Sequence, residues 1–308
     1  MADTPEIRHT LGEEAARQLA NTTKTVPQMK AITPRWLVSF LPWTPVEAGT
    51  YRVNRVKATH AETPADVTCG TREEIDLPET FVNYDEKPRE YTLCAVTTVL
   101  DVQTRVSDLY RSPYDQIREQ LRLIIELVKE RQEKEIINNA DYGLLNNVAP
   151  EGHVKTRTGP PTPDDLDELI ARVWKEPAFF LAHPRAIAAF GRECTRRGVP
   201  PPTVTLFGSP FLTWRGIPLV PSDKLTVKGG KTNILLLRTG EKKQGVIGLF
   251  QPGLVGEVSP GLSVRFMGIN RKAIASYLIS LYCSAAILTE DAVGVLENVS
   301  VETYHEYK

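Results

Sequence analysis

Cysteine is scarce in this sequence, with four in 308 residues, and the four lie far apart along the chain. They are Cys69, Cys94, Cys194 and Cys283. No two have the close spacing of a zinc-binding or thiol–disulfide exchange motif, which excludes both kinds of local site. We therefore expect buried free thiols, as is usual for a protein of the reducing cytoplasm.

An excess of charge of one sign is also missing, because 37 lysines and arginines oppose 38 aspartates and glutamates. This balance gives no general attraction to nucleic acid or to an anionic membrane. Residues 1–10 lack the apolar core of a signal peptide. The most apolar segment, Ala273–Leu288, is interrupted by serines and is shorter than the about 20 residues that a spanning helix needs. We expect a soluble, cytoplasmic protein without membrane insertion.

Recognisable catalytic and metal-binding motifs are missing as well. The five histidines are scattered, and none lies at metal-ligand spacing from another histidine or from a cysteine. Gly229–Thr232 is similar to the end of a phosphate-binding loop, but Leu225 stands where that motif needs its first glycine. Ser209 lacks the second glycine of a nucleophile elbow. The sequence therefore predicts no enzyme activity, catalytic residue, metal or cofactor for this chain.

Residues 1–50 do not have the pattern of a self-contained domain. A short helix is predicted over Leu11–Ala20, whose apolar residues share one face. Beyond it, Trp36 and Trp43 lie among prolines, in a segment that cannot form a core by itself. Such large aromatic side chains need another surface to bury against, and we predict that a neighbouring subunit supplies it. Both tryptophans are therefore candidate assembly residues.

Residues 51–106 are predicted to be β structure around a long excursion. Tyr51–Val56 alternates apolar and polar residues, and Tyr91–Val106 offers a second extended run. The charged, proline-containing sequence between them is too long for an unstructured insert in a compact domain. We expect a protruding arm or hairpin that packs on a partner.

The clearest element is a long amphipathic helix over Ser112–Asn139, with apolar residues at helical spacing. Its first residues, Ser112–Asp115, suit an N-cap followed by proline and a capping-box acid. Side-chain pairs are predicted between Glu126 and Lys129 and between Glu130 and Lys134.

A proline-rich loop near residue 160 marks a boundary before a mixed region. Helices are predicted to start at Thr162–Pro163 and at Pro184, with His183 as a helix-start residue. Short strands are predicted at Ala178–Ala182, Val204–Phe207, Ile217–Val220, Ile234–Leu237, Val246–Phe250 and Leu262–Met267. Ala273–Leu288 is ambiguous, because its apolar residues alternate as in a strand while its serines share a helical stripe.

The order of these elements resembles the α+β fold of tailed-phage major capsid proteins of the Hong Kong 97 type. In the second half, the resemblance is carried by Phe179–Arg185, Leu206–Gly208 and Trp214–Ser222. It implies an N-terminal arm (1–50), an extended loop (51–106), a peripheral domain with a long spine helix (107–160), an axial domain (161–270) and a C-terminal return to the peripheral domain (271–308). It also implies that residues 273–288 form a strand.

Within that fold the sequence is similar to family 2 encapsulins, of the 2A subgroup that lacks a cyclic-nucleotide-binding insertion. Glu14–Asn21, Trp43–Asn54 and Gly261–Asn270 carry this resemblance. It implies a shell subunit that self-assembles, as about 60 copies, into an icosahedral nanocompartment. It further implies a cargo enzyme, a cysteine desulfurase, which uses pyridoxal phosphate and acts in sulfur metabolism or storage. The cofactor would then belong to the cargo and not to the shell.

Turns of the axial region are candidates for lining a pore, and Lys228 and Lys231 are the residues we single out. A plain solvated turn explains them equally well. Two other functions stay open. A viral or prophage major capsid protein of the same fold would enclose DNA. A soluble α+β enzyme would assemble its site only in three dimensions and would be a monomer or a small oligomer.

Overall fold

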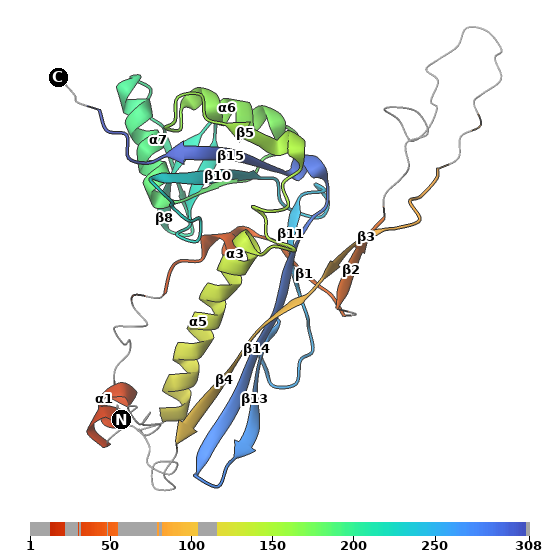
Figure 1. The fold of residues 1–308 in the computed structure, drawn as a ribbon, viewed down its shortest axis with the longest axis vertical. Coiled ribbons are helices and arrows are strands. Elements are labelled where there is room, and N and C mark those ends of the chain that lie inside the picture. The colour runs from red at the N-terminus through yellow and green to blue at the C-terminus, as the bar shows by residue number, and fades with distance from the viewer. Residues whose placement is uncertain are drawn as a thin grey trace, which may run out of the picture.

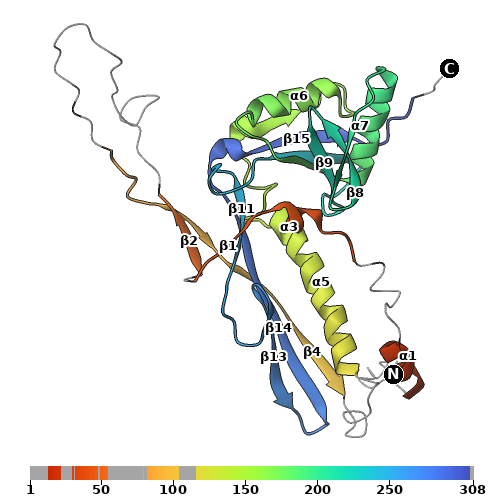
Figure 2. The same ribbon diagram turned by 180° about the vertical axis from the view of Figure 1, so that it is seen from behind.

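The computed structural model describes residues 13–21, 30, 32–47, 49–54, 79, 82–103 and 116–305. The described strands form two large sheets and a two-stranded ribbon. Figures 1 and 2 show the seven-stranded sheet with its helices at one end, and the six-stranded sheet extending away from it beside helix α5 (Gln116–Asn138). The protein is therefore an elongated body with a broad upper part.

The seven-stranded sheet forms the unit that corresponds to the predicted axial domain. Its order is β5 (His153–Lys155), β15 (Val293–Ser300), β10 (Lys231–Leu237), β6 (Phe179–Ala182), β9 (Ile217–Pro221), β8 (Ser209–Trp214) and β7 (Thr203–Leu206). Helices α6 (Pro163–Arg172) and α7 (Pro184–Arg196) pack on it, with Leu166, Phe190 and Leu236 fully buried between the layers. From the sequence, no strand was predicted at β5, β8 or β15 of this sheet.

Local signals place the starts of both helices as predicted. The Thr162 hydroxyl accepts a hydrogen bond from the Asp165 backbone N–H at 3.2 Å. The Asp165 carboxylate in turn accepts one from the Thr162 N–H at 3.0 Å, which completes a capping box. At α7, His183 Nδ1 accepts a hydrogen bond from the Arg185 N–H at 3.1 Å. These contacts satisfy backbone donors that a helix start leaves unpaired.

The six-stranded sheet is built around one long strand, β14. Its members are β1 (Trp43–Pro45), β4 (Cys94–Gln103), β11 (Val246–Phe250), β12 (Glu257–Ser259), β13 (Leu262–Ile269) and β14 (Ile274–Ile287). Strand β4 pairs along one edge of β14, while β13 and β11 pair along the other. The ambiguous segment 273–288 is thus a strand, as the resemblance predicts, because pairing on both edges satisfies its backbone.

Helix α5 packs on the face of this sheet that β4 and β14 form. Val128 contributes to a buried cluster with Ile279 and Leu281 of β14. The predicted start at Ser112–Asp115 lies outside the described residues. Of the helices in the described part of the chain, none is both long and apolar enough to cross a membrane.

One of the two side-chain pairs predicted along α5 is confirmed. Lys129 Nζ lies 3.8 Å from a Glu126 carboxylate oxygen. The prediction for Glu130 is wrong, since its carboxylate binds Lys224 at 2.7 Å and Arg35 at 3.0 Å rather than Lys134. These partners are distant in sequence, so the fold replaces a local pair with tertiary contacts.

Strands β2 (Thr50–Val53) and β3 (Arg89–Thr92) form the ribbon, which projects sideways from the body (Figure 1). The predicted extended run over Tyr91–Val106 is divided into β3 and β4 at Leu93. The Tyr91 hydroxyl donates a hydrogen bond to the Ile287 carbonyl and ties the ribbon to β14. Residues 55–78, most of the predicted extended loop, lie outside the described residues.

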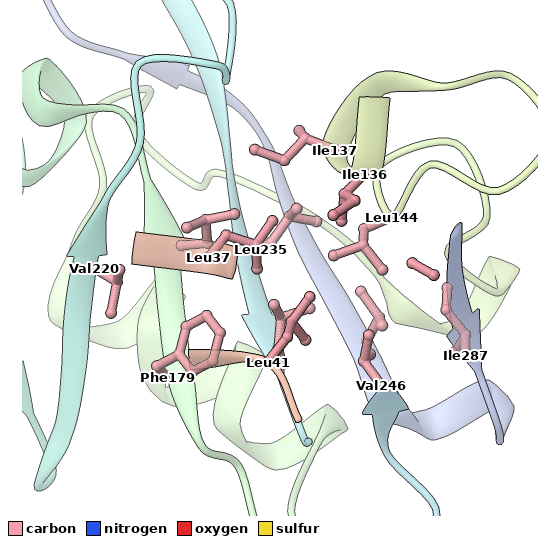
Figure 3. Close-up of a cluster of buried hydrophobic side chains, with 14 of the residues drawn as sticks. Leu37, Leu41, Ile136, Ile137, Leu144, Phe179, Val220, Leu235, Val246 and Ile287 are labelled. Atoms are coloured by element: carbon pink, nitrogen blue, oxygen red, sulfur yellow. The ribbon is translucent and has the colours of Figure 1, made fainter. Parts of the chain in front are cut away.

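A single cluster of buried apolar side chains joins the two sheets (Figure 3). It draws on helix α3 (Trp36–Phe40), on the end of α5 and on strands of both sheets. Its labelled members are Leu37, Leu41, Ile136, Ile137, Leu144, Phe179, Val220, Leu235, Val246 and Ile287. Because these side chains are nearly all fully buried, the sheets share one hydrophobic core.

The chain crosses between the two sheets more often than the predicted boundaries allow. Strands β11, β12 and β13 lie within the predicted axial range, 161–270, yet they belong to the six-stranded sheet. Strand β15 lies within 271–308 and returns, after the short helix η2 (Glu290–Ala292), to the seven-stranded sheet. Strand pairing over long sequence separations decides this arrangement. Helix α1 (Glu13–Asn21) overlaps the helix that was predicted over Leu11–Ala20. In space it lies beside the end of α5 that is remote from the seven-stranded sheet (Figure 1).

Candidate functional site

The described residues contain no group of three or more histidine, cysteine, aspartate or glutamate side chains that could hold a metal. The turn from Lys228 to Lys231 is a two-residue hairpin, in which the two lysines exchange backbone hydrogen bonds of 2.8 and 3.0 Å. Gly229 and Gly230 both have positive φ, which this turn requires and glycine adopts without strain. The turn therefore has no phosphate-binding geometry. Both lysine side chains are exposed, and their pore role stays a prediction.

Trp43 is half-buried, and its own chain covers the buried part. Its indole N–H donates a hydrogen bond of 2.9 Å to the Val38 carbonyl. The indole ring lies directly over Gly248 of β11, where a Cβ would come within 2.6 Å of it. The expectation that Trp43 needs a neighbouring subunit to bury it is therefore revised. Its place in assembly remains a prediction.

Trp36 has a similar position in an aromatic cluster at the turn between β7 and β8. Its ring lies 5.2 Å from that of Phe211, edge to face, and 6.1 Å from that of Phe207. Phe207 has a positive φ of 50° and belongs to the hairpin turn. Strand β7 therefore ends at Leu206, one residue before the end of the predicted strand. Phe40 packs 5.1 Å from Phe207 and completes the cluster. The N-terminal segment is thus docked on the seven-stranded sheet.

A nearly buried ion network fixes the segment just before α3. The Thr33 N–H and Arg35 donate hydrogen bonds to the Glu130 carboxylate at 2.8 and 3.0 Å. Arg35 also binds Glu126, and Lys224 lies 2.7 Å from Glu130. Burial alone would raise the pKa of Glu130, but the hydrogen bonds from Lys224 and Thr33 outweigh it and hold the pKa below its usual range. The network clamps the N-terminal segment, the spine helix and the loop after β9 together.

Glu133 is the next buried acid on the same helix, with its side chain only 1% exposed. The Ser222 hydroxyl donates a hydrogen bond of 2.7 Å to one carboxylate oxygen. The other oxygen is buried without a hydrogen-bond partner among the described atoms. Burial is the main reason that the pKa of Glu133 is raised. Nothing in the sequence marked Glu130 or Glu133 as buried, because the partners of both come from distant segments.

An exposed apolar surface lies on the outer strands of the six-stranded sheet, β12 and β13, and on the turn before β12. We call it the β12–β13 surface, and its members are Val255, Val258, Phe266, Met267 and Ile269. Each is between 57% and 77% exposed. The register of β13 shifts between Phe266 and Gly268, so the inside–outside alternation breaks there. Several large apolar side chains exposed on neighbouring strands are typical of a protein–protein interface.

Comparisons with known proteins agree with this arrangement. The sequence profile described as type 2A encapsulin shell protein, SrpI-like, matches residues 50–303. The type 2A encapsulin shell protein SrpI of Synechococcus elongatus is 70% identical over 298 residues, which cover 97% of this chain and 96% of SrpI. A type 2A encapsulin shell protein of Mycolicibacterium paratuberculosis is 62% identical over 298 residues, with 97% of each chain covered.

Solved structures give the same result. The holo-SrpI encapsulin complex from Synechococcus elongatus matches with a TM-score of 0.83 and 66% identity, over 97% of this chain and 99% of that one. The capsid protein of a native GTA particle matches with a TM-score of 0.64 but 14% identity, over 91% and 94% of the two chains, which shows a shared fold alone. The predicted phage-capsid-like fold is confirmed, and the family is one of structural shell proteins rather than enzymes. The chain belongs to the type 2A encapsulin shell proteins.

Proposed function

We propose that this chain assembles with about 60 copies of itself into a closed icosahedral shell. The observation that carries the proposal is the match to the holo-SrpI encapsulin complex along nearly the whole length of both chains. The surface of the single subunit supports it. The β12–β13 surface leaves large apolar side chains exposed, and the β2–β3 ribbon projects from the body (Figure 1). Both features suit a subunit that buries exposed surface against neighbouring subunits.

The enclosed cargo, we infer, is a cysteine desulfurase in the cytoplasm, so that the compartment serves sulfur metabolism or storage. This inference rests on the resemblance of the sequence to family 2 encapsulins. One relative was solved as a holo-SrpI encapsulin complex, which favours a loaded shell. Pyridoxal phosphate would be bound by the cargo, whose chemistry it supplies. The role of the shell subunit would be to capture the cargo enzyme and to retain it inside the shell.

Small molecules would reach the cargo through openings between subunits. We assign Lys228 and Lys231 to the lining of such an opening. Both lie on an exposed hairpin turn of the seven-stranded unit, and both side chains are free to point into solvent. Their positive charge would favour the passage of anionic solutes.

A viral or prophage capsid is the second function that the fold would allow. The GTA capsid protein is only 14% identical to this chain, so that match shows the fold alone. The identity to type 2A encapsulin shell proteins is between 60% and 70%. A compartment for a protein is therefore favoured over a container for DNA.

Size-exclusion chromatography followed by negative-stain electron microscopy tests assembly directly. Uniform hollow particles in the void volume are expected. A monodisperse species of one to about four subunits would contradict the shell proposal. Cargo is tested separately, by mass spectrometry of proteins that co-purify with particles from the native host. Particles that hold DNA, or a protein without pyridoxal phosphate, would contradict the cargo proposal and leave assembly intact.

A further inference from the structure

Two cysteines that are distant in sequence stand opposite one another in the six-stranded sheet. Cys94 is the first residue of β4, and it pairs in register with Cys283 of β14. Directly opposite residues of an antiparallel pair point to the same face, with Cβ atoms about 4.5–5.5 Å apart. A disulfide needs a Cβ separation of about 3.5–4.5 Å. A small approach of the strands and a rotation of the side chains would therefore bring the two sulfur atoms within bonding distance.

Both thiols lie near helix α5, since Cys94 packs against the buried cluster that contains Ile136, and Cys283 shares a cluster with Val128. Tyr142 is buried beside them, and burial together with Cys283 and Cys94 raises the pKa of its hydroxyl. Burial, with Cys94 and Glu135 nearby, raises the pKa of the Cys283 thiol to about 12. Cys283 is fully buried, whereas Cys94 is half-buried. The two thiols therefore form an inner and an outer member of one pair.

The outer thiol has access to a cavity. Cys94 lines a pocket of about 530 Å³ between β4 and α5, together with Val96, Ile124 and Leu127. Arg131 and its ion-pair partner Glu135, 2.6 Å away, also line the pocket. One water occupies about 30 Å³ of liquid, so the pocket admits an oxidant the size of hydrogen peroxide. Such a molecule would meet Cys94 before Cys283.

We propose that Cys94 and Cys283 form an oxidisable dithiol site, which a peroxide converts into a disulfide between β4 and β14. The Cys94 thiol gives up its proton, and the thiolate attacks one peroxide oxygen as the O–O bond breaks. Cys94 becomes a sulfenic acid, and the released hydroxide takes up that proton and leaves as the first water. The sulfur of Cys283 then attacks the sulfenic sulfur, and the S–O bond breaks. The released hydroxide takes the Cys283 proton and leaves as the second water. Two thiols are oxidised and one peroxide is reduced to two waters.

The cross-link would tie β4 to the central strand of its sheet at the base of the β2–β3 ribbon. Only Leu93 separates Cys94 from the end of β3. In the described part of the chain, β14 is the one strand with which β4 pairs. The disulfide would therefore fix the position from which the ribbon projects.

Cys194 provides an internal control. It is fully buried in α7, in a different hydrophobic cluster, and burial raises the pKa of its thiol to about 11. Cys69 lies outside the described residues. The experiment is therefore performed on the natural chain and repeated in a Cys69→Ser variant, which removes that thiol from competition.

The test is oxidation of the purified protein with hydrogen peroxide, followed by alkylation in denaturant, tryptic digestion without reductant and mass spectrometry. We expect residues 90–105 and 273–308 to be recovered as one linked peptide, lighter by two hydrogens than the separate peptides together and separated by dithiothreitol. Cys194 should remain fully alkylated. The linked peptide should be lost completely in Cys94→Ser and in Cys283→Ser.

The order of attack is tested with dimedone, which labels sulfenic acids. Cys283→Ser should accumulate label on Cys94, whereas Cys94→Ser should leave Cys283 unlabelled. The proposal is overturned if the natural chain oxidises Cys94 to sulfinic or sulfonic acid without the linked peptide. It is equally overturned if both thiols stay reduced, or if the link appears only after denaturation. Because the natural chain carries the primary readout, misfolding of a serine variant cannot decide the result.

Discussion

Arg238 and Asp291 form a two-point ion pair where the two sheets meet, with nitrogen–oxygen distances of 2.7 and 3.2 Å. The Arg238 side chain, which follows directly after β10, is only 1% exposed. It also donates a hydrogen bond of 2.7 Å to the Thr289 hydroxyl. Its backbone carbonyl accepts a hydrogen bond from the Val246 N–H at 2.7 Å. Arg238 therefore ties the end of β10 to the start of β11 and to the link between β14 and β15.

Removing the acid of this pair should destabilise the protein more than removing the base. Asp291→Ala leaves a buried guanidinium without its counter-ion, and breaking a buried pair in this way costs about 3–5 kcal/mol. Arg238→Met leaves Asp291 with Lys175, which lies 2.9 Å away and half-exposed. We expect a smaller loss, about 1–3 kcal/mol. Urea unfolding midpoints, measured at one protein concentration, compare the two variants.

Lys175→Met is the control for that comparison, because it removes only the solvent-exposed partner of Asp291. Exposed pairs contribute about 0–1 kcal/mol. A Lys175→Met variant as unstable as Asp291→Ala would show that the exposed lysine, and not the buried arginine, is the main partner.

The same pair should make stability fall in acid. The hydrogen bonds from Arg238, supported by Lys175 and Thr289, hold the pKa of Asp291 well below its usual range. A carboxylate whose pKa is lower in the folded state contributes stability that is fully present above its unfolded pKa, about 3.9. That contribution is lost as the pH falls from there through the folded pKa. The difference in unfolding midpoint between the natural chain and Asp291→Ala should therefore shrink below pH about 4. A difference that stays constant down to pH about 2 would contradict this assignment.

Glu133 should show the opposite dependence on pH. Its pKa is raised by burial, so the folded state holds its proton to a higher pH than the unfolded state does. Stability is therefore lost as the pH rises from about 4.3, the unfolded value, through the folded pKa. Glu133→Gln removes this loss, and its amide oxygen can still accept the hydrogen bond from Ser222. We expect the stability of the variant, relative to the natural chain, to increase as the pH rises above about 4.

Urea midpoints over that range measure the effect, and Glu176→Gln is the matched control. Glu176 is 59% exposed and pairs with Lys243 at the surface. Its replacement should change stability by less than about 1 kcal/mol at every pH. A flat difference for Glu133→Gln would show that water or a neighbouring subunit solvates this carboxylate.

The sequence predicted the features that depend on residues close together in the chain. Thr162 and Asp165 are three residues apart, so their capping box was visible, and the alternation in Tyr51–Val56 correctly marked β2. Glu133 and Arg238 were not singled out, because their burial depends on partners 89 and 53 residues away. A charged residue carries no local mark of burial. The tryptophans show the same limit, since the pattern identified them as needing a surface but could not show that Gly248 provides it.

The close contact of Trp43 and Gly248 can be measured by adding a methyl group. Gly248→Ala would place a Cβ 2.6 Å from the indole, and the ring must move to accommodate it. Overpacking of this kind costs about 1–3 kcal/mol. Gly191→Ala is the matched control, because Gly191 lies within α7 and an added Cβ meets nothing within 4 Å. There we expect a gain of up to about 1 kcal/mol, from the higher helix propensity of alanine.

The double variant Trp43→Ala with Gly248→Ala separates this clash from other effects. Trp43→Ala alone should cost less than the about 3–5 kcal/mol typical of a fully buried tryptophan, because this side chain is half-buried. If the clash is with the indole, the added cost of Gly248→Ala should disappear in that background. An unchanged cost would place the strain elsewhere. Particle counts by electron microscopy on the same variants also test the predicted role of Trp43 in assembly.

The β12–β13 surface should be needed for assembly but not for folding of the subunit. Phe266 and Met267 are 57% and 60% exposed, so replacing both with serine removes little buried apolar area from the isolated chain. If a neighbouring subunit covers them, the loss of two large apolar contacts costs about 2–4 kcal/mol at each interface. A closed shell repeats each interface many times, so a modest loss per contact abolishes assembly. We expect the double variant to elute as small species with an unchanged circular dichroism spectrum.

The control is Val199→Ser, which removes an apolar side chain of similar exposure, 48%, beyond the end of α7. Intact particles from the double variant, or equal loss of particles from the control, would show that this surface has no special part in assembly.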